Sequence, residues 1–419
     1  MFMRRASARG DRPGPLRNRT YRRLFAAQVV SLAGTGVTTV ALGLLAYDMA
    51  GANAGAVLGG ALALKMVAYV GLAPVIAAFA GLVPRRRLLV VLSLVQATVV
   101  LGMTFVDEVW HVCVLIFVLH AAAAGYTPAF QAAIPEVLPD ERVYTRALSL
   151  SRLAYDLGEL LSPAIAAGLL LLVGFDALFL VDVASFLLAA GLIMGSGLEA
   201  SARGVSADRT LPRITSGVRQ YLGTPRLRGL LALNLAVAAA SAMTIVNTVV
   251  LVRDHLGKGE SAVALALGAA GAGSMTVALA LPRVLDRLPD RRVMLVGGVL
   301  LPLGLVATAL VSSFAALLLV WFALGVGLSL VQTPAGRLIQ RSGDEREREA
   351  LFAAQFSLSH ACWLVTYPIA GVVGSLIGID AVAWLLAGMA AAATLVAMRL
   401  WRPPPIAAGR YGGRDAASA

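Results

Sequence analysis

The segment LVPRRRLLVV, residues 82–91, returns later in the chain as RLPDRRVMLV, residues 287–296. Pro84 then pairs with Pro289, an offset of 205 positions. Further matches keep nearly this offset and the same order along the chain: TPA at 127–129 and 333–335, DER at 140–142 and 344–346, Pro163 with Pro368, and Gln28 with Asn234. Self-similarity at a fixed period indicates a duplicated architecture. We therefore predict two equivalent halves.

The composition places the chain in a membrane. Of its 419 residues, 59% are hydrophobic and only 14% are charged. A soluble domain has about 45–50% apolar and about 25% charged residues. A soluble fold of this length has no means of covering so much apolar surface, so the sequence predicts an integral membrane protein.

Twelve segments are long and apolar enough to span a bilayer, which takes about 20 residues. They lie near residues 24–47, 55–80, 87–106, 109–133, 146–173, 177–197, 229–252, 261–283, 292–311, 315–336, 350–376 and 381–401. An offset near 205 residues equals six spans plus a loop. The predicted fold class is an all-α membrane protein with twelve transmembrane helices in two six-helix halves related by pseudo-twofold symmetry. The expected parts are a cytoplasmic arm (1–23), the first half (24–197), a cytoplasmic linker (198–228), the second half (229–401) and a cytoplasmic tail (402–419).

Basic residues orient the predicted helices. The arm, the loops after the even-numbered spans and the tail together carry 31 of the 35 lysine and arginine residues. Such residues accumulate on the cytoplasmic side of a membrane. We therefore expect a multi-pass protein of the cell membrane with both termini cytoplasmic. The net charge of +12 then belongs to loops beside spans rather than to a nucleic-acid-binding surface.

The predicted linker contains the stretch PRITSGVRQYLG, residues 212–223. In it Ile214, Val218, Tyr221 and Leu222 recur at helical spacing, with arginines among them. This pattern predicts a short helix lying at the cytoplasmic interface. A plain linker is the alternative.

Several stretches resemble the major facilitator superfamily, and within it the twelve-helix drug-efflux antiporters of bacteria, the macrolide-exporter-like branch. The entry into the first helix of that branch is similar to NRTYRRLFAAQVVSLAG (18–34). Its helix 4–5 connection is similar to TPAFQAAIPEVLPDERVYTRALSLSRL (127–153), and its helix 7–8 turn to RDHLGKGESAVALALGAAGAGS (253–274). The resemblance covers nearly the whole chain. It implies a substrate site near the midplane between two halves that rock to alternate access.

The resemblance also implies a cytoplasmic gate. The superfamily signature between helices 2 and 3, roughly G-x-L-A-D-R-x-G-R-R, is fairly well kept as PRVLDRLPDRR (282–292) in the second half. In the first half, Gly81 stands at the position of the acid. The gate residues implied by this match are Asp286, Arg287, Arg291, Arg292, Arg86 and Arg87. The alternative is that these arginines serve only as topology signals.

An antiporter signature in helix 5, roughly G-x-x-x-G-P-x-x-G-G, is matched in part by GELLSPAIAA, residues 158–167. Gly158 and Pro163 are kept, and Ser162, Ala166 and Ala167 replace the remaining glycines. All the replacements are small, so the close helix packing that such motifs permit is retained.

The same predicted helix carries three charges in its apolar stretch. Arg152, Asp156, Glu159 and Pro163 stand at i, i+4, i+7 and i+11, so they share one helix face. A charge at the centre of a span costs roughly 2.5–3.5 kcal/mol, and such residues are usually functional. Arg152 and Asp156 have the spacing of an ion pair, which leaves Glu159 less compensated. Glu159, with Asp156 second, is our candidate for the coupling proton; a fixed salt-bridge network to the eighth or first span is the alternative.

Other polar residues within spans are candidates for contact with substrate. Lys65 lies near mid-depth of the second span, where it either pairs with the helix 5 acids or binds an anionic substrate. The candidate cavity and substrate residues are Lys65, Arg152, Gln28, Asn234, Gln355 and His360. The amides serve equally well to join helices, and His360 is equally compatible with packing.

These observations favour a secondary active transporter, a proton-coupled exporter of small amphipathic compounds or drugs that works by alternating access. We expect a monomer in the lipid bilayer that needs no cofactor or metal and binds no nucleic acid. One alternative is export of metal ions or metal chelates through His360, Cys362 and the acids. A membrane-embedded lipid-modifying enzyme is the other, but no HxxxxD pattern follows a histidine, and the chain has no G-x-x-x-x-G-K loop for ATP. We therefore do not expect an enzyme. The pattern leaves the substrate and the direction of transport open.

Overall fold

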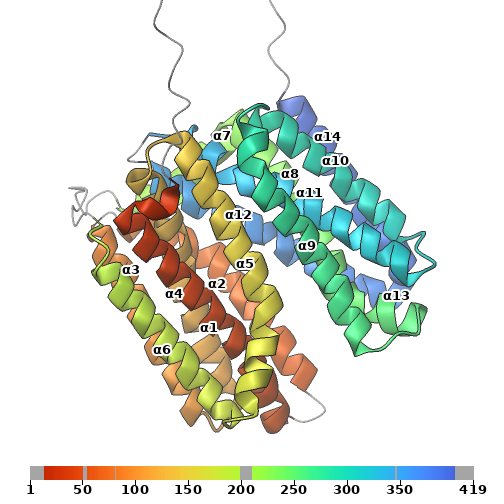
Figure 1. The fold of residues 1–419 in the computed structure, drawn as a ribbon, viewed down its shortest axis with the longest axis horizontal. Coiled ribbons are helices and arrows are strands. Elements are labelled where there is room, and N and C mark those ends of the chain that lie inside the picture. The colour runs from red at the N-terminus through yellow and green to blue at the C-terminus, as the bar shows by residue number, and fades with distance from the viewer. Residues whose placement is uncertain (1–13, 51–53, 81, 199–209, 345–346, 402–419) are drawn as a thin grey trace, which may run out of the picture.

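The computed structural model describes residues 14–50, 54–80, 82–198, 210–344 and 347–401. Within these ranges every regular element is a helix (Figure 1). Residues 14–23 of the expected arm are described, and the rest of the arm and the expected tail lie outside the described residues.

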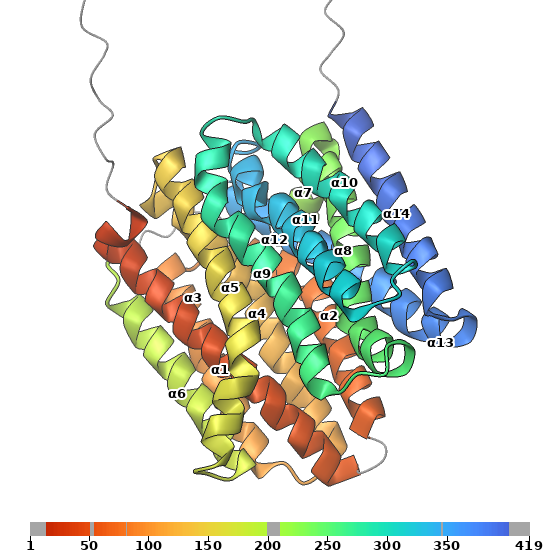
Figure 2. The ribbon, with the colours of Figure 1, turned by 45° about the vertical axis from the view of Figure 1, so that its right-hand side comes forward.

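The helices gather into two groups (Figures 1 and 2). The first helix group contains α1 (Arg19–Ala50), α2 (Ala54–Ala80), α3 (Arg85–Gly102), α4 (Val109–Val137), α5 (Glu141–Leu170) and α6 (Phe175–Met194). The second helix group contains α8 (Pro225–Val250), α9 (Glu260–Leu285), α10 (Asp290–Thr308), α11 (Phe314–Gln340), α12 (Arg348–Pro368), α13 (Gly374–Ile377) and α14 (Ile379–Leu400). Short 3-10 or π turns extend several ends: Pro15–Arg17, Met103–Phe105, Leu251–His255 and Ile369–Val373.

Eleven described helical segments are long and apolar enough to cross a membrane. They include every long helix of the two groups except α5, whose thirty residues contain the charged stripe. The chain is therefore a multi-pass membrane protein. Both α1 and α14 have one end at the same side of the molecule, where the chain enters α1 and leaves α14 (Figure 1). We call this the terminal side and the opposite side the far side.

Local signals explain where helices begin. Helix α5 starts at Glu141, five residues before the predicted span, because the Asp140 carboxylate accepts hydrogen bonds from the backbone N–H groups of Arg142 and Val143 at 3.0 and 3.2 Å. An N-cap of this kind satisfies donors that the first turn leaves unpaired. Helix α8 starts with Pro225 in its first turn, where the missing N–H carries no penalty.

The same pairs of helices pack together in both groups. In the first group α1 contacts α5 and α6, α2 contacts α4, and α3 contacts α4 and α6. In the second group α8 contacts α12 and α14, α9 contacts α11, and α10 contacts α11 and α14. The internal sequence repeat is thus accompanied by a repeated pattern of helix neighbours.

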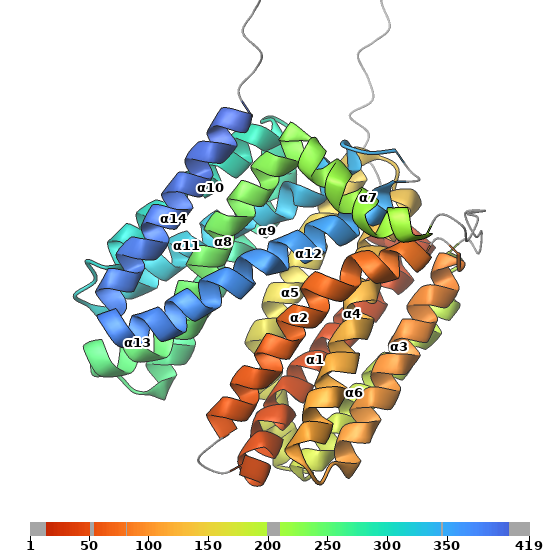
Figure 3. The ribbon, with the colours of Figure 1, turned by 180° about the vertical axis from the view of Figure 1, so that it is seen from behind.

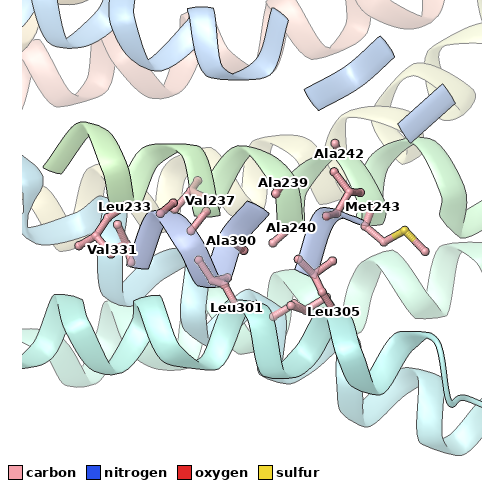
Figure 4. Close-up of a cluster of buried hydrophobic side chains, with 14 of the residues drawn as sticks. Leu233, Val237, Ala239, Ala240, Ala242, Met243, Leu301, Leu305, Val331 and Ala390 are labelled. Atoms are coloured by element: carbon pink, nitrogen blue, oxygen red, sulfur yellow. The ribbon is translucent and has the colours of Figure 1, made fainter. Parts of the chain in front are cut away.

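Small residues bring these helices close. In the second group, Leu233, Val237, Leu301, Leu305 and Val331 enclose alanines of α8 and α14 (Figure 4). A Cβ atom added at Gly273 of α9 would collide with the carbonyl of Phe322, and one at Gly325 of α11 with that of Ala270. Without a hydrophobic effect between helices in lipid, such close backbone contact is a main source of packing energy.

Between the groups, α2 lies against α12 and α5 against α9, with further contacts of α4 to α12 and of α5 to α11. In both pairs the helices are closest toward the terminal side and diverge toward the far side (Figures 1 and 3). The predicted linker helix is α7 (Thr210–Gly223), which packs against α2, α8 and α12. Tyr221 on it is fully buried, so this helix is docked on protein along one face.

Candidate functional site

A polar centre formed by Arg152, Asp156, Ser274 and Gln332 joins the two helix groups. The Arg152 Nη2 atom lies 2.9 Å from Oδ1 of Asp156, one turn further along α5. The Nε–H of Arg152 donates to Ser274 Oγ of α9 at 2.9 Å and to Asp156 Oδ2 at 3.3 Å. The Nη1 group donates to Gln332 Oε1 of α11. One arginine therefore binds three helices.

The pair of Arg152 with Asp156 is the predicted one, and its partners across the groups were not predicted. Asp156 is only 5% exposed, so removing the Arg152 charge would leave a buried carboxylate without compensation. Glu159 lies on the same helix, but its side chain lies outside the described residues. The polar centre thus joins α5 to α9, the eighth span, through a hydrogen bond to Ser274 rather than through the expected salt bridge. The role of Glu159 stays a proposal.

Aromatic side chains of both groups meet in a second cluster, which we call the aromatic cluster: Tyr69, His120, Phe356, His360 and Trp363. Tyr69 of α2 is central, with ring centroids 5.4 Å from His120 of α4 and 4.8 and 4.7 Å from Phe356 and His360 of α12. The His360 ring is 5.0 Å from the Trp363 ring.

Lys65 lies beside the aromatic cluster. Its Nζ atom is 5.7 Å from the centroid of the Tyr69 ring, one turn along α2, which is within the range of a cation–π interaction. A hydrogen bond at 2.6 Å from Ser357 Oγ to the carbonyl of Val70 joins α12 to α2 at the same level. Lys65 and His360, two of the predicted substrate residues, are therefore brought to one place.

The predicted amides lie elsewhere. Gln28 accepts a hydrogen bond from Ser151 Oγ at 3.0 Å and joins α1 to α5 within the first group. Gln355 accepts a hydrogen bond from the Tyr221 hydroxyl and joins α12 to α7. Burial raises the pKa of this tyrosine well above its ordinary value, so the hydroxyl remains a donor. Asn234 is buried in α8, and within the described part of the chain its Nδ2 atom has no hydrogen-bond partner.

On the terminal side, two charged clusters connect the groups. In the first, which we call the Arg85 corner, Arg85 at the start of α3 lies 2.5 Å from Glu136 of α4 and 3.0 Å from Glu349 in the first turn of α12. Arg85 and Glu349 are almost fully buried. The Arg85 corner therefore ties the first group to α12 of the second.

The second cluster, the Asp290 corner, consists of Asp290, Arg337, Arg341, Glu141 and Thr145. Arg341, which directly follows α11, contacts Asp290 of α10 at 2.6 Å and Glu141 of α5. Arg337 of α11 lies 2.7 Å from Glu141 and 3.4 Å from Asp290, and it donates to Thr145 Oγ1 at 2.9 Å. This corner ties the second group to α5 of the first.

The gate residues implied by the family signature lie beside these corners. Asp286 forms an ion pair with Arg142 at 3.3 Å between side chains that are 45% and 66% exposed. Arg87, Arg287 and Arg292 are exposed, and Arg86 and Arg291 are half-buried. The corner residues were missed, although the sequence held a signal: Arg85 with Asp290, and Glu136 with Arg341, are each 205 positions apart.

The degenerate antiporter signature has a packing partner. A Cβ atom at Gly36 of α1 would collide with Ser162 of α5, whose Oγ donates to the carbonyl of Gly158 at 2.5 Å. Gly36 thus supplies the small residue that Ser162 no longer provides. Among the described residues, no three His, Cys, Asp or Glu side chains gather in an arrangement that holds a metal ion.

Comparisons with known proteins give the same fold. The human organic anion transporter MFSD10 (TETRAN) superposes with a TM-score of 0.78 at 13% identity, covering 92% of this chain and 100% of that one. A bacterial homologue of the iron transporter ferroportin in its outward-facing state gives 0.72 at 17% identity, covering 90% and 98%. The major facilitator superfamily transporter FucP in its outward conformation gives 0.71 at 13% identity, covering 91% and 98%. No curated protein matches by sequence.

Sequence comparison identifies the family. Residues 12–340 match the family described as transmembrane secretion effectors, which is most of the chain. Identities of 13–17% to the solved structures show the shared fold alone. The chain belongs to the transmembrane secretion effector family and is a membrane transporter with the major facilitator fold.

Proposed function

We propose that the protein is a proton-coupled exporter of small amphipathic compounds that works by alternating access. The observation that carries the proposal is the polar centre, in which Arg152, paired with the buried Asp156, holds α9 and α11 of the opposite helix group. An ionisable pair placed on the contact between two moving bodies links its protonation to their separation. The protein acts as a monomer in the cell membrane.

The alternation involves twelve spans in two equivalent halves. Helix α5 is added to the eleven apolar helices to give twelve spans, and the polar centre offsets the cost of its charges. The repeated helix neighbours in the two groups and the constant sequence offset support a pseudo-twofold axis along the membrane normal. We assign the first half to residues 24–197, the linker to 198–228 and the second half to 229–401.

The terminal side is the cytoplasmic side and is closed by the two corners. Support comes from the excess of basic residues there and from ion pairs that cross between groups at Glu349 and Glu141. The divergence of α5 from α9 and of α2 from α12 supports an opening on the far side. To open inward, the groups separate at both corners and at the polar centre.

The proton is carried by Glu159, with Asp156 as second choice. Asp156 is already paired with Arg152 at 2.9 Å, and Glu159, seven positions from Arg152, lies outside the i, i+4 spacing of such a pair. Carboxyl groups at such depth are expensive when charged. Taking up a proton therefore lowers the cost of the occluded state through which the transporter must pass.

The test uses the full chain in liposomes with an imposed pH gradient and a trapped pH-sensitive dye. Addition of a panel of amphipathic compounds is expected to release protons along the gradient with the unaltered protein. We expect Glu159→Gln, or Asp156→Asn if Asp156 is the carrier, to lower this proton-coupled flux at least about tenfold. A loss of about 1.4 kcal/mol in coupling free energy is enough for a factor of ten.

A matched control is Asp182→Asn. Asp182 is a buried acid that accepts hydrogen bonds from Thr38 at 2.6 Å and Ser185 at 2.8 Å within the first group. It should keep the coupling. If both Glu159→Gln and Asp156→Asn retain gradient-driven flux, neither acid carries the proton and the coupling mechanism is wrong.

A further inference from the structure

Two polar side chains on the terminal side lack partners. Tyr144, in the first turn of α5, is fully buried, and its hydroxyl has no hydrogen-bond partner among the described residues. Arg348 is the first residue of α12, and its Nε atom is likewise buried without a partner. Its side chain forms no ion pair within the described part of the chain. Buried polar groups in folded proteins are almost always hydrogen-bonded, so both groups need an explanation.

The two side chains lie on either side of the contact between the helix groups. Tyr144 belongs to the first group, yet a Cβ atom added at Gly336 of α11 would lie 2.7 Å from its hydroxyl oxygen. The next residue, Thr145, accepts a hydrogen bond from Arg337 of α11 at 2.9 Å. The positive charges of Arg348 and Arg337 both act on the Tyr144 hydroxyl. The hydroxyl therefore points into the second group, toward positive charge.

The acids on either side are already paired with other arginines. Glu349, which follows Arg348 in α12, is bound to Arg85 at 3.0 Å. Glu141 of α5 is bound to Arg337 at 2.7 Å. The charge of Arg348 is thus left without a counter-charge among the described residues, beside a hydroxyl without an acceptor.

We propose that Tyr144 and Arg348 form a binding site for a small inorganic anion, with chloride as the ion to test. A tyrosine hydroxyl is protonated below a pKa of about 10, so it donates, and a guanidinium group has only donors. A water molecule satisfies the hydroxyl but leaves the charge of Arg348 uncompensated, whereas an anion serves both groups. Leu148 lies against the same position of Gly336, which leaves a narrow space that suits a single atom better than a tetrahedral ion.

The anion would be held by both helix groups. Tyr144 belongs to α5 of the first group and Arg348 to α12 of the second. Bound chloride therefore adds to the Arg85 corner and the Asp290 corner in keeping the terminal side closed. Separation of the groups takes one donor away from the other and releases the ion.

The experiment is thermal unfolding of the full chain in detergent, with chloride replacing gluconate at constant ionic strength. For the unaltered protein, the unfolding midpoint should rise saturably by at least about 2 °C as chloride replaces gluconate, because a ligand that binds only the folded state stabilises it. Equal midpoints in the two salts would overturn the proposal without any variant.

The first variant is Tyr144→Phe, which removes only the hydroxyl. In gluconate it should be at least as stable as the unaltered protein, because it loses a buried group that has no partner there. In chloride it should be less stable, since it gains little from the ion. Tyr126→Phe is the matched control: its hydroxyl is also buried without a described partner, but it lies in α4, and this variant should keep the full response to chloride.

The second variant is Arg348→Gln, which should abolish the rise with chloride. Arg228→Gln is its control, because Arg228 is an exposed arginine in the first turn of α8. A full chloride response in both Tyr144→Phe and Arg348→Gln contradicts the assignment. If Arg348→Gln fails to fold by size-exclusion chromatography, the comparison of Tyr144→Phe with Tyr126→Phe decides.

This measurement is separable from the test of export. Chloride binding at equilibrium needs neither a pH gradient nor a transported compound. A protein that responds to chloride but shows no proton-coupled flux would contradict only the proposed export function, and the reverse result would contradict only the anion site.

Discussion

The Arg85 corner and the Asp290 corner occupy equivalent places in the two helix groups, and the charges of their within-group pairs are exchanged. Each joins the first residue of one helix to the end of the next within its group: Arg85 to Glu136, and Asp290 to Arg341. Each then reaches an acid in the first turn of a helix of the other group, Glu349 or Glu141. The two corners thus share one arrangement in which the signs of the within-group pair are exchanged while the residue from the other group is a glutamate in both. What the two corners have in common is therefore an arginine that bridges an acid of its own group and a glutamate of the other group, whichever end of the within-group pair carries the arginine.

The largest effect is expected from breaking that complementarity in one corner. Arg85→Glu brings three carboxylates together where Arg85 and Glu349 are almost fully buried. We expect transport to fall at least about tenfold, because an uncompensated buried charge costs several kcal/mol. Substrate flux in liposomes measures this.

The exchange Arg85→Glu with Glu136→Arg should restore function. It gives the Arg85 corner the same order of charges as the Asp290 corner, with an arginine that again faces Glu349. If the double variant transports no better than Arg85→Glu alone, the two corners are not equivalent and the comparison fails.

A smaller effect is expected to distinguish the buried charged residues of the terminal side from the exposed ones. The Arg337 side chain is 10% exposed and binds Glu141, Asp290 and Thr145. Arg337→Met should lower the free energy of unfolding by about 3 kcal/mol, in line with the loss of one partner from a buried pair. Thermal unfolding in detergent provides the measurement.

The matched control is Asp286→Asn, at the residue implied by the family signature. Its ion pair with Arg142 joins side chains that are 45% and 66% exposed, and such surface pairs contribute at most about 1 kcal/mol. If Asp286→Asn lowers the free energy of unfolding as much as Arg337→Met does, the signature residues and not the buried corners hold the cytoplasmic gate closed.

The sequence predicted those parts of the structure that depend on nearby residues. Hydropathy located the long helices, eleven of which are apolar enough to cross a membrane, and the i, i+4 spacing predicted the pair of Arg152 with Asp156. Helix α5 begins earlier than expected because Asp140 caps it, a signal visible in the sequence but not used.

Contacts between the two helix groups could not be predicted from the spacing of nearby residues. Ser274 and Gln332 are 122 and 180 positions from Arg152, and which face each helix turns toward the other group depends on packing along its whole length. The aromatic cluster was missed for the same reason, because a tyrosine or tryptophan in a span reads equally well as facing lipid. The family signature pointed to loop charges, whereas the buried corners are formed by residues at helix ends.

The central claim is that the two helix groups rock about the contacts that join them. It is tested most directly by double electron–electron resonance distances in nanodiscs. Spin labels are placed at Leu82 and Leu288 on the terminal side, and at Leu172 and Leu376 on the far side, after both native cysteines are replaced. All four positions are exposed, and each pair joins the two groups. We predict reciprocal changes on lowering pH, with one distance lengthening as the other shortens. Two distances that stay fixed, or that change in the same direction, would contradict alternating access.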